Sequence, residues 1–379
     1  MERIALLGNI AAENRIIENG VIIVSDNIIE YAGERKGVAL PPEARDYGGR
    51  LLAPGFVDIH CHAGNGYFVN EEPELAAGFH LRYGTTSMLC SLYRDIDFNG
   101  TLRALEKIKS AMRKSPHILG VHMEGPYLSP LYGAKAGGGA VSVNPEQYRA
   151  IISSGIIKQW TFSPEIEGIG VFLRDIVAAG IVPSIGHSEA SPEQVYAAEG
   201  AGARIVTHLT DATGCSVSPS RFAGTKEMSF DSAAMLCDNL YYEIILDKDG
   251  VHVRHDMAKL IIKTVGIDKV IGITDNCGDD TQAAGEKTSD VNMANGELMG
   301  SRLTMDNVAR NFLSLGLSVP DVFKVVSLNP AKAIRTDKVT GSLEKGKRAD
   351  ILLTDKNLSS VEVLDLRSAE ALGLRREPA

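Results

Sequence analysis

Short apolar runs separated by polar turns mark both ends of this chain. Near the N-terminus, three runs rich in strand-forming residues are separated by Asn19-Gly20 and by Asp26-Asn27. Two-residue turns of Asn, Asp and Gly between such runs predict β-hairpins. Close to the other end, Ala349–Leu353 has the same strand-like character. We therefore expect the two ends of the chain to form one small β-sandwich domain.

The middle of the chain changes to an alternation of apolar runs and amphipathic stretches. Helical patterns occur at Leu102–Arg113, Pro192–Glu199 and His255–Val265. Eight runs have the length and composition of buried strands, at Gly55–His60, Thr85–Leu92, Ile118–Met123, Ile157–Phe162, Ile181–Gly186, Ala203–Thr207, Tyr241–Leu246 and Lys269–Thr274. Eight strand–helix alternations predict an α/β fold with a (β/α)8 TIM-type barrel. An open doubly wound sheet is the alternative, but no glycine-rich phosphate-binding sequence follows an early strand.

The predicted elements divide the chain into three segments. Residues 1–52 and 336–379 are assigned to the β-sandwich domain, and residues 53–335 to the barrel. Within the barrel segment, Gly278–Asn295 is polar and contains glycine, so we expect a mobile loop there.

Composition and charge narrow the classes of ligand. The 379 residues are 44% hydrophobic and 23% charged, as in an ordinary globular protein, and the net charge is -9 with no basic run. This balance argues against nucleic acid or an anionic membrane as a partner and leaves a small-molecule substrate. The five cysteines are widely spaced without a CxxC pair, and the N-terminus lacks the apolar core of a signal peptide. We expect a cytoplasmic protein with reduced thiols and no membrane span.

Residues that can bind metal ions occur at the C-terminal ends of five predicted strands. Chemistry in a barrel takes place at this end. The residues are His60, His62, Glu124, His187, His208 and Asp275. The alternative to metal binding, for each histidine, is a structural role in which hydrogen bonds satisfy the ring. For His122, within the third strand, we prefer this structural role. The shared position of the six residues favours a metal site.

The ligand types suit Zn²⁺, Fe²⁺ or Mn²⁺, as one or two ions. Glu124 could bridge two ions, and a metal makes hydroxide available from water near neutral pH. Asp275 is the candidate general base and acid, because the eighth strand closes the barrel beside the first and a carboxylate can transfer the proton to a leaving nitrogen.

Several motifs resemble the N-acetylglucosamine-6-phosphate deacetylase family of the amidohydrolase superfamily. Similar segments cover nearly the whole chain, namely Pro54–His62, His122–Tyr127, Gly186–Ser188, Thr207–Leu209, Asp249–Val253, Thr274-Asp275, Gly296–Asp306, Ser327–Ala331 and Gly341–Asp350. The resemblance implies a metal-dependent deacetylase that removes an acetyl group from an N-acetylated amino sugar, most simply N-acetylglucosamine 6-phosphate. It also implies a barrel with a small β-sandwich, a homodimer and a role in carbohydrate metabolism.

The resemblance further implies residue roles. Glu124, His187 and His208 would hold the principal metal, and His60 and His62 match members that bind a second ion. Asp275 would be the general base and acid. The residues implied for substrate binding are Lys135, Asp211, Ala212, Arg221, His252 and Leu298, with Lys226 as an alternative to Arg221.

The sequence departs from the family pattern after the sixth-strand histidine. Asp211 stands where the family usually has Asn, and its charge would repel a phosphate. Two other readings therefore stay open: an amidohydrolase acting on a different N-acyl amine or cyclic amide, and a non-enzymatic relative that keeps the barrel as an interaction module.

Overall fold

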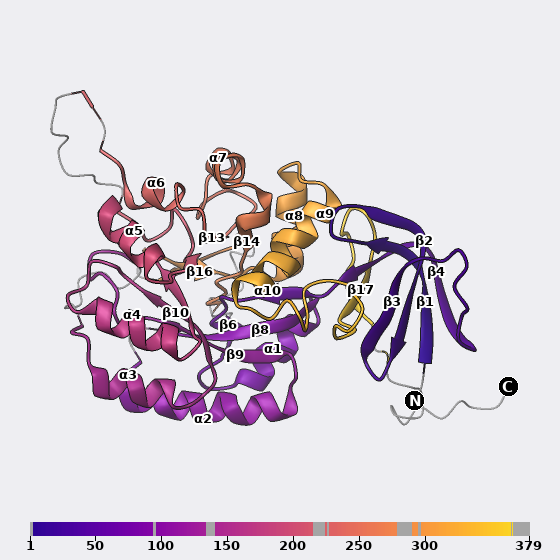
Figure 1. Ribbon diagram of the computed structural model, residues 1–379, viewed down its shortest axis with the longest axis horizontal. Helices are drawn as coiled ribbons and strands as arrows, with labels where there is room; N and C mark the ends of the chain where they lie inside the picture. Colours follow the sequence, from indigo (N-terminus) through magenta and orange to yellow (C-terminus); the bar gives the residue numbers. More distant parts are fainter. Residues whose placement is uncertain are drawn as a thin grey trace.

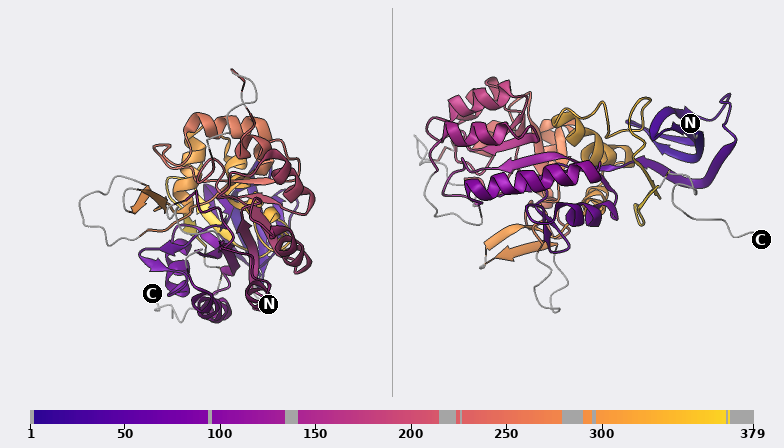
Figure 2. Two further views of the ribbon diagram at one scale, coloured as in Figure 1. Left: turned by 90° about the vertical axis from the view of Figure 1, so that its left-hand side faces the viewer. Right: turned by 90° about the horizontal axis from the view of Figure 1, so that it is seen from below.

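The protein consists of a barrel of parallel strands and a smaller mixed sheet beside it (Figure 1). The computed structural model describes residues 3–364 and 366 except 94–95, 134–140, 215–223, 226, 279–289 and 295–296. Helices surround the barrel, and the small sheet stands at one side of it in Figure 1 and in the right-hand view of Figure 2. Within the described residues no helix combines the length and apolar character needed to cross a membrane. The predicted barrel is confirmed, and so is a small β-domain built from both chain ends; the domain predicted as a β-sandwich consists of one six-stranded mixed sheet.

Strands from both ends of the chain form the small sheet. Its order is β18-β17-β4-β1-β2-β3, and β1 and β4 are parallel while the other neighbours are antiparallel. The strands are β1 (Arg3–Ala11), β2 (Ile16–Ser25), β3 (Ile28–Glu34), β4 (Glu43–Pro54), β17 (Ile351–Thr354) and β18 (Glu362–Val363). One face buries a cluster that includes Leu6, Ile22 and Ile351, which joins residues of both chain ends in one core. Because β4 pairs with β17 as far as Pro54, this sheet leads directly into the barrel; the domain limits proposed above stay predictions.

The hairpin predicted at Asn19-Gly20 is wrong. These residues lie inside β2, and the chain turns earlier, between β1 and β2. Asn19 has a positive φ of 49°, and its N–H donates to the Asn9 side chain (3.1 Å) where the strand register shifts. The pair therefore forms an irregularity within a long antiparallel ladder. At Asp26-Asn27 both φ angles are positive and the predicted hairpin is present between β2 and β3.

The barrel strands follow one another in sequence order. The order is β5-β8-β9-β10-β11-β12-β13-β14, with parallel pairing throughout. The strands are β5 (Phe56–Asp58), β8 (Thr85–Leu92), β9 (Ile118–Glu124), β10 (Ile157–Phe162), β11 (Val182–Ile185), β12 (Ile205–Val206), β13 (Tyr241–Ile244) and β14 (Val270–Gly272). Every residue of β8 is buried, as expected for a strand covered on both sides. All eight predicted strands are thus present.

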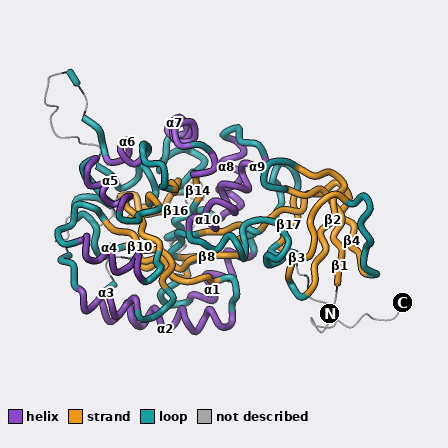
Figure 3. Tube along the Cα trace, viewed as in Figure 1, coloured by secondary structure: helices purple, strands orange, loops and turns teal. Residues whose placement is uncertain are grey.

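The helices cover the outside of these strands (Figure 3). They are α1 (Pro73–Leu81), α2 (Phe98–Lys114), α3 (Pro145–Ile152), α4 (Ile169–Ala178), α5 (Pro192–Gly200), α6 (Phe230–Ala234), α7 (His255–Val265), α8 (Met305–Ser314), α9 (Val319–Phe323) and α10 (Asn329–Ala333), with short η1 (Ile267–Lys269) and η2 (Lys324–Leu328). In α2 the Asp97 side chain accepts a hydrogen bond from Gly100 N at the start, and Ala104, Ile108 and Ala111 are buried on one face. An N-cap and an apolar stripe thus explain why this segment is helical and which side it packs.

The first and last barrel strands meet mainly beyond their ends. Thr274 Oγ1 donates to Asp58 Oδ2 (2.6 Å), Asp275 N donates to His60 O (2.8 Å), and His62 N donates to Asn276 O (2.9 Å). These hydrogen bonds close the barrel at its C-terminal mouth.

The segment after the eighth strand is only partly a loop. Val291–Ala294 (β15) pairs with Glu297–Ser301 (β16) in a two-stranded sheet. The prediction of a loop over Gly278–Asn295 is therefore wrong for β15, while residues 279–289 lie outside the described residues.

Candidate metal centre and active site

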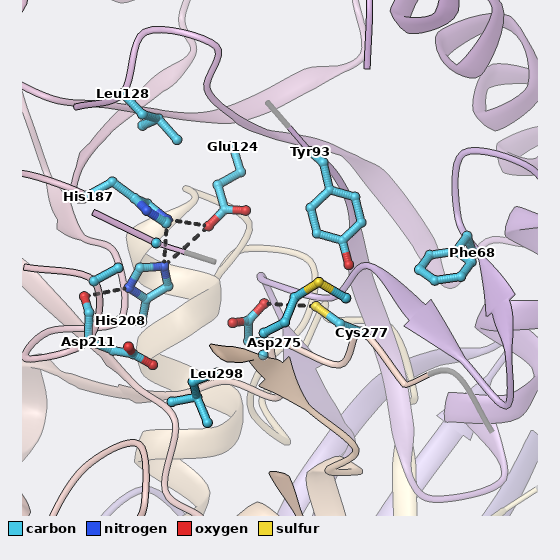
Figure 4. Close-up of a pocket in the computed structure, with 14 residues that line it drawn as sticks. Phe68, Tyr93, Glu124, Leu128, His187, His208, Asp211, Asp275, Cys277 and Leu298 are labelled. Atoms are coloured by element: carbon cyan, nitrogen blue, oxygen red, sulfur yellow. Dashed lines mark hydrogen bonds and ion pairs between the residues drawn. The ribbon is translucent and has the colours of Figure 1, made fainter. Parts of the chain in front are cut away.

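The six predicted ligands converge at the barrel mouth. Figure 4 shows four of them, Glu124, His187, His208 and Asp275. His60 and His62 follow β5, Glu124 ends β9, and Asp275 follows β14. His187 and His208 follow β11 and β12. The side chains of His60, His62 and His208 are at most 4% exposed, and those of Glu124, Asp275 and His187 are 11–12% exposed. Residues far apart in the sequence thus share one small volume because parallel strands end at the same side.

The first group of ligand atoms consists of Glu124, His187 and His208. Glu124 Oε1 lies 2.9 Å from His187 Nε2 and 3.2 Å from His208 Nε2, and the two nitrogens are 3.1 Å apart. Two nitrogens that bind one tetrahedral zinc ion at about 2.0–2.1 Å are roughly 3.3 Å apart. The three atoms therefore have nearly the separations of a metal-binding set.

The outer ring nitrogens of this group are held by backbone carbonyls. His187 Nδ1 donates to Tyr132 O (3.4 Å) and His208 Nδ1 donates to Asp211 O (3.1 Å). Because each Nδ1 donates outward, each Nε2 is left to face Glu124 Oε1 and the other ring, where it can bind a cation. This arrangement is the usual one for metal-binding histidines.

The second group lies beside the first and shares Glu124. His60 Nε2 is 3.2 Å from His62 Nε2, and His62 Nε2 is 3.2 Å from Glu124 Oε2. Asp275 Oδ1 lies 3.5 Å from His60 Nε2 and 3.4 Å from His62 Nε2. Glu124 Oε1 faces His187 and His208 and also lies 3.4 Å from His60 Nε2, while its Oε2 faces His62, so the residues present fit one ion or a pair of ions.

The electrostatics of the mouth favour positive charge. Burial alone would lower the pKa of His208, but its bond to the Glu124 carboxylate raises that pKa to about 9. Burial likewise opposes protonation of His60, yet Asp275 and Glu124 raise its pKa well above the usual value. Burial would raise the pKa of Glu124, but His60, His187 and His208 hold it well below its usual range. The carboxylates of this mouth therefore favour positive charge on the neighbouring rings, and a divalent ion bound there would compete with protons.

Several of these ligands lie on strained turns. His187, His208 and Asp275 have φ angles of 49°, 27° and 46°, in the left-handed region that side chains rarely adopt. Each such residue costs about 1–3 kcal/mol. A Cβ on Gly133 would lie 2.7 Å from His187 Nδ1, so only glycine leaves room for that ring. The positive φ angles thus lower the free energy of unfolding, and they direct these side chains into the mouth.

The residues that support His60 and His62 were not predicted from the sequence. Glu243, completely buried in β13, accepts from His60 Nδ1 (3.2 Å) and from Gln159 Nε2 (2.8 Å). The Tyr93 ring stacks on His62 with centroids 3.8 Å apart and an interplanar angle of 9°. A charged residue inside the apolar run of Tyr241–Leu246 was the available signal for Glu243.

His122 is a satisfied core histidine, as predicted. Its Nδ1 pairs with Ser91 Oγ (2.9 Å) and its Nε2 with Thr161 Oγ1 (2.8 Å). Burial lowers its pKa well below the ordinary value, so the ring is neutral.

Only some of the residues implied for substrate binding line the pocket. Asp211, Ala212 and Leu298 line the pocket over the ligands, whereas Lys135 and Arg221, together with Lys226, lie outside the described residues. His252 uses both ring nitrogens within the protein, toward Asp247 Oδ2 (3.2 Å) and Gly300 O (3.0 Å). Burial alone would lower the pKa of His252, but Asp247 and neighbouring carboxylates raise it.

The pocket has an apolar and an acidic side. It encloses about 240 Å³, and Phe68, Tyr93, Leu128, Leu298 and Met299 form much of its wall. Its acidic lining residues are Glu124, Asp211 and Asp275, and the described lining contains neither Lys nor Arg. A buried ligand set at the floor of a pocket is the arrangement of an active site.

Comparison with known proteins gives relatives over most of the chain. The N-acetylglucosamine-6-phosphate deacetylase of Lysinibacillus sphaericus is 28% identical over 335 residues, covering 82% of this chain and 83% of the relative. The N-acetylgalactosamine-6-phosphate deacetylase of Escherichia coli O157:H7 is 27% identical, covering 84% and 87%. A structure of the Mycobacterium smegmatis N-acetyl-D-glucosamine-6-phosphate deacetylase, a variant in complex with N-acetyl-D-glucosamine-6-phosphate, has a TM-score of 0.84 at 25% identity and covers 95% of this chain and 97% of its own.

The model of the amidohydrolase family matches residues 51–372, which include the barrel and all six ligands. The predicted resemblance is confirmed, and so is the prediction of an enzyme, a deacetylase that hydrolyses carbon–nitrogen bonds. The reading as a non-enzymatic interaction module is thereby set aside. This chain belongs to the amidohydrolase family.

Proposed function

We propose that this protein removes the acetyl group from an N-acetylated amino sugar, with N-acetylglucosamine 6-phosphate as the first substrate to test. The observation that carries the proposal is the shared ligand set, in which Glu124 joins two groups of histidines beneath a pocket. The relatives, which are deacetylases of two amino-sugar phosphates, support the substrate class.

Glu124, His187 and His208 would hold one divalent ion of Zn, Fe or Mn type, and His60 and His62 with Glu124 or Asp275 would hold a second. Such an ion supplies Lewis acidity to the water and to the amide carbonyl. The chain itself supplies the proton transfers.

Asp275 is the residue proposed to move the proton. Its Oδ1 faces His60 and His62, and its backbone N–H is tied to His60 O, so the carboxylate is fixed at the pocket floor. It would accept a proton from the attacking water and deliver it to the amide nitrogen as the C–N bond breaks. The products are acetate and the free amine, so the atoms balance.

Asp211 favours a second candidate, an N-acyl amine without phosphate. Its carboxylate lies in the pocket wall (Figure 4), and the described lining residues offer it no Lys or Arg. A phosphate beside this carboxylate would bind weakly unless a cation separates the two charges. A hydroxyl or an ammonium group would instead donate to it.

The deciding experiment measures acetate release from N-acetylglucosamine and N-acetylgalactosamine, each with and without the 6-phosphate, and from other N-acetyl amines. Asp211→Asn should raise kcat/KM for a phosphorylated substrate if the phosphate lies near this residue, because the like charge is removed. Asp238→Asn, an exposed site outside the pocket lining, is the control for net charge. No acetate from any N-acetyl sugar would reject the amino-sugar assignment.

We also propose a cytoplasmic homodimer. The described cysteines, Cys61, Cys90, Cys237 and Cys277, are unpaired, which suits a reducing compartment. Light scattering during gel filtration tests the dimer, and a monomeric mass would reject it.

A further inference from the structure

The pocket contains a thiol that the deacetylation chemistry does not use. Cys277 lies two residues after Asp275, is 2% exposed, and lines the pocket with the ligands. Its Sγ is 3.7 Å from Asp275 Oδ1 (Figure 4). Potential ligand atoms of His62, Asp275 and Cys277 all lie within 4.8 Å of one another.

The backbone around this thiol is fixed from two sides. Cys277 N donates to Ser301 O (2.9 Å), and Ser301 N donates to Asp275 O (2.8 Å). Between these bonds Gly300 has a φ of 60°, and a Cβ there would lie 2.5 Å from Cys277 Sγ. The absence of a side chain at Gly300 therefore leaves the space in which the sulfur sits next to the Asp275 carboxylate.

The separation of sulfur and oxygen suits a shared ion. With a metal–sulfur bond of about 2.3 Å and a metal–oxygen bond of about 2.0–2.2 Å, tetrahedral ligands are roughly 3.5 Å apart. The Sγ–Oδ1 distance of 3.7 Å and the His62 Nε2–Asp275 Oδ1 distance of 3.4 Å are both close to such values. An S–H···O hydrogen bond from Cys277 to Asp275 has the same distance, so the carboxylate, the thiol and the adjacent His62 together, rather than this distance alone, point to a shared ion.

We propose that Cys277 is a ligand of the ion held by His62 and Asp275, so that this chain has a cation position of mixed imidazole, carboxylate and thiolate character. The proposal rests on the proposed metal chemistry of the same mouth. When the sulfur–metal bond forms, the thiol proton is released to solvent. A thiolate ligand favours thiophilic ions such as Zn²⁺, Co²⁺ or Cd²⁺ over Mn²⁺ at this position.

The competing role is that of a positioning residue. In that case Cys277 donates its S–H to Asp275 Oδ1, orients the carboxylate, and never contacts a metal. Replacement by Ser would then preserve the orientation, because a hydroxyl is the better donor, and metal preference would not change.

The test loads the full-length, chelator-treated protein with Co²⁺ and records its absorption spectrum. We expect a thiolate-to-cobalt charge-transfer band that is lost in Cys277→Ser and retained in Cys237→Ser, a buried thiol bonded to Ala233 O elsewhere. Competition titrations should show that Cys277→Ser lowers the ratio of Cd²⁺ to Mn²⁺ affinity by at least about tenfold.

Three results would overturn the proposal: no such band in the parent protein, a band that persists without Cys277, or an unchanged affinity ratio. A persisting band would assign the thiolate to another cysteine, such as Cys61. If Cys277→Ser does not fold, Cys277→Ala is used, and the spectrum of the parent protein still decides. If the protein binds Co²⁺ and releases acetate but shows no band, only the thiolate ligand is rejected. If it neither binds metal nor releases acetate, the proposed function is rejected.

Discussion

Glu243→Gln removes one negative charge behind the metal centre with almost no change in shape. Glu243 Oε2 accepts from His60 Nδ1 (3.2 Å) and from the backbone N–H of His208 (3.4 Å). Its Oε1 accepts from Gln159 Nε2, and Gln159 Oε1 has no hydrogen-bond partner among the described residues. The Gln159 amide can therefore rotate and accept from the new NH₂ group, while the new amide oxygen still accepts from His60. Only the charge is lost.

The expected magnitude follows from this difference. A hydrogen bond to a charged group contributes about 1.5–3 kcal/mol and a neutral one about 0.5–1.5 kcal/mol, so roughly 1–1.5 kcal/mol disappears. At about 1.4 kcal/mol for each factor of ten, ion affinity at the His60–His62 side should fall roughly 5- to 10-fold. The group of Glu124, His187 and His208 should change less, because Glu243 contacts only the backbone of His208.

The assay is a Zn²⁺ titration of metal-free protein in competition with a chromophoric chelator. Asp306→Asn is the matched control, since Asp306 is a buried carboxylate paired with Arg310 and Thr304 outside the ligand set. Dissociation constants within twofold of the parent for Glu243→Gln, or equal weakening in the control, would refute the reasoning that the His60–Glu243 bond tunes the ligand.

Three further perturbations test the site and the core. Asp275→Asn should retain fold and at least one ion yet lose about 10²–10⁴-fold in kcat, because an amide cannot accept the proton; parental kcat with normal metal content would assign the proton to another group. Burial lowers the pKa of His80 from 6.5 to about 4, so only the unfolded chain takes up this proton between those values. Above pH 6.5 the group has no effect, and on acidification to about pH 4 it costs about 3 kcal/mol of stability. Urea unfolding near neutral pH and at about pH 4.5 should show a smaller loss in His80→Gln, and an equal loss would contradict the assignment. Trp160→Ala should lower the unfolding free energy by about 3–5 kcal/mol, because it empties a fully buried site and removes the Nε1 bond to Gly125 O (2.7 Å); a loss below 1 kcal/mol in urea would show that the core refills the space.

The barrel and the convergence of its ligands could be predicted because local pattern determines both. Apolar runs such as Thr85–Leu92 are long enough to identify as buried strands, and parallel strands place their C-terminal residues on one side. The prediction of a hairpin at Asn19-Gly20 was wrong, although its signal is local too. Contacts with the neighbouring strand outweigh that signal, because Asn19 N–H bonds to the Asn9 side chain and the ladder between β1 and β2 continues past it. Local composition cannot report a partner on another strand.

The support of the ligands could not be predicted for a related reason. Glu243 and His60 are 183 positions apart, and only the closed barrel brings them together. The positive φ angles of His187 and His208 could not be predicted from the sequence either, because neither residue is glycine and no turn motif marks them. Contacts between residues far apart in the sequence determine which carboxylate accepts a hydrogen bond from which histidine ring, and residue type alone does not predict them.

The meeting of the first and last barrel strands gives the metal a mechanical role. His60 lies on one edge of that seam and Asp275 on the other, and their side chains face the same point. An ion bound by both would cross-link the beginning and the end of the strand sequence, much as a disulfide closes a long loop. Removal of the ion should therefore loosen the barrel first between β5 and β14, and faster amide hydrogen exchange at Asp275 and His62 would be its signature. An ion bound there for catalysis would therefore also stabilise the fold that positions its ligands.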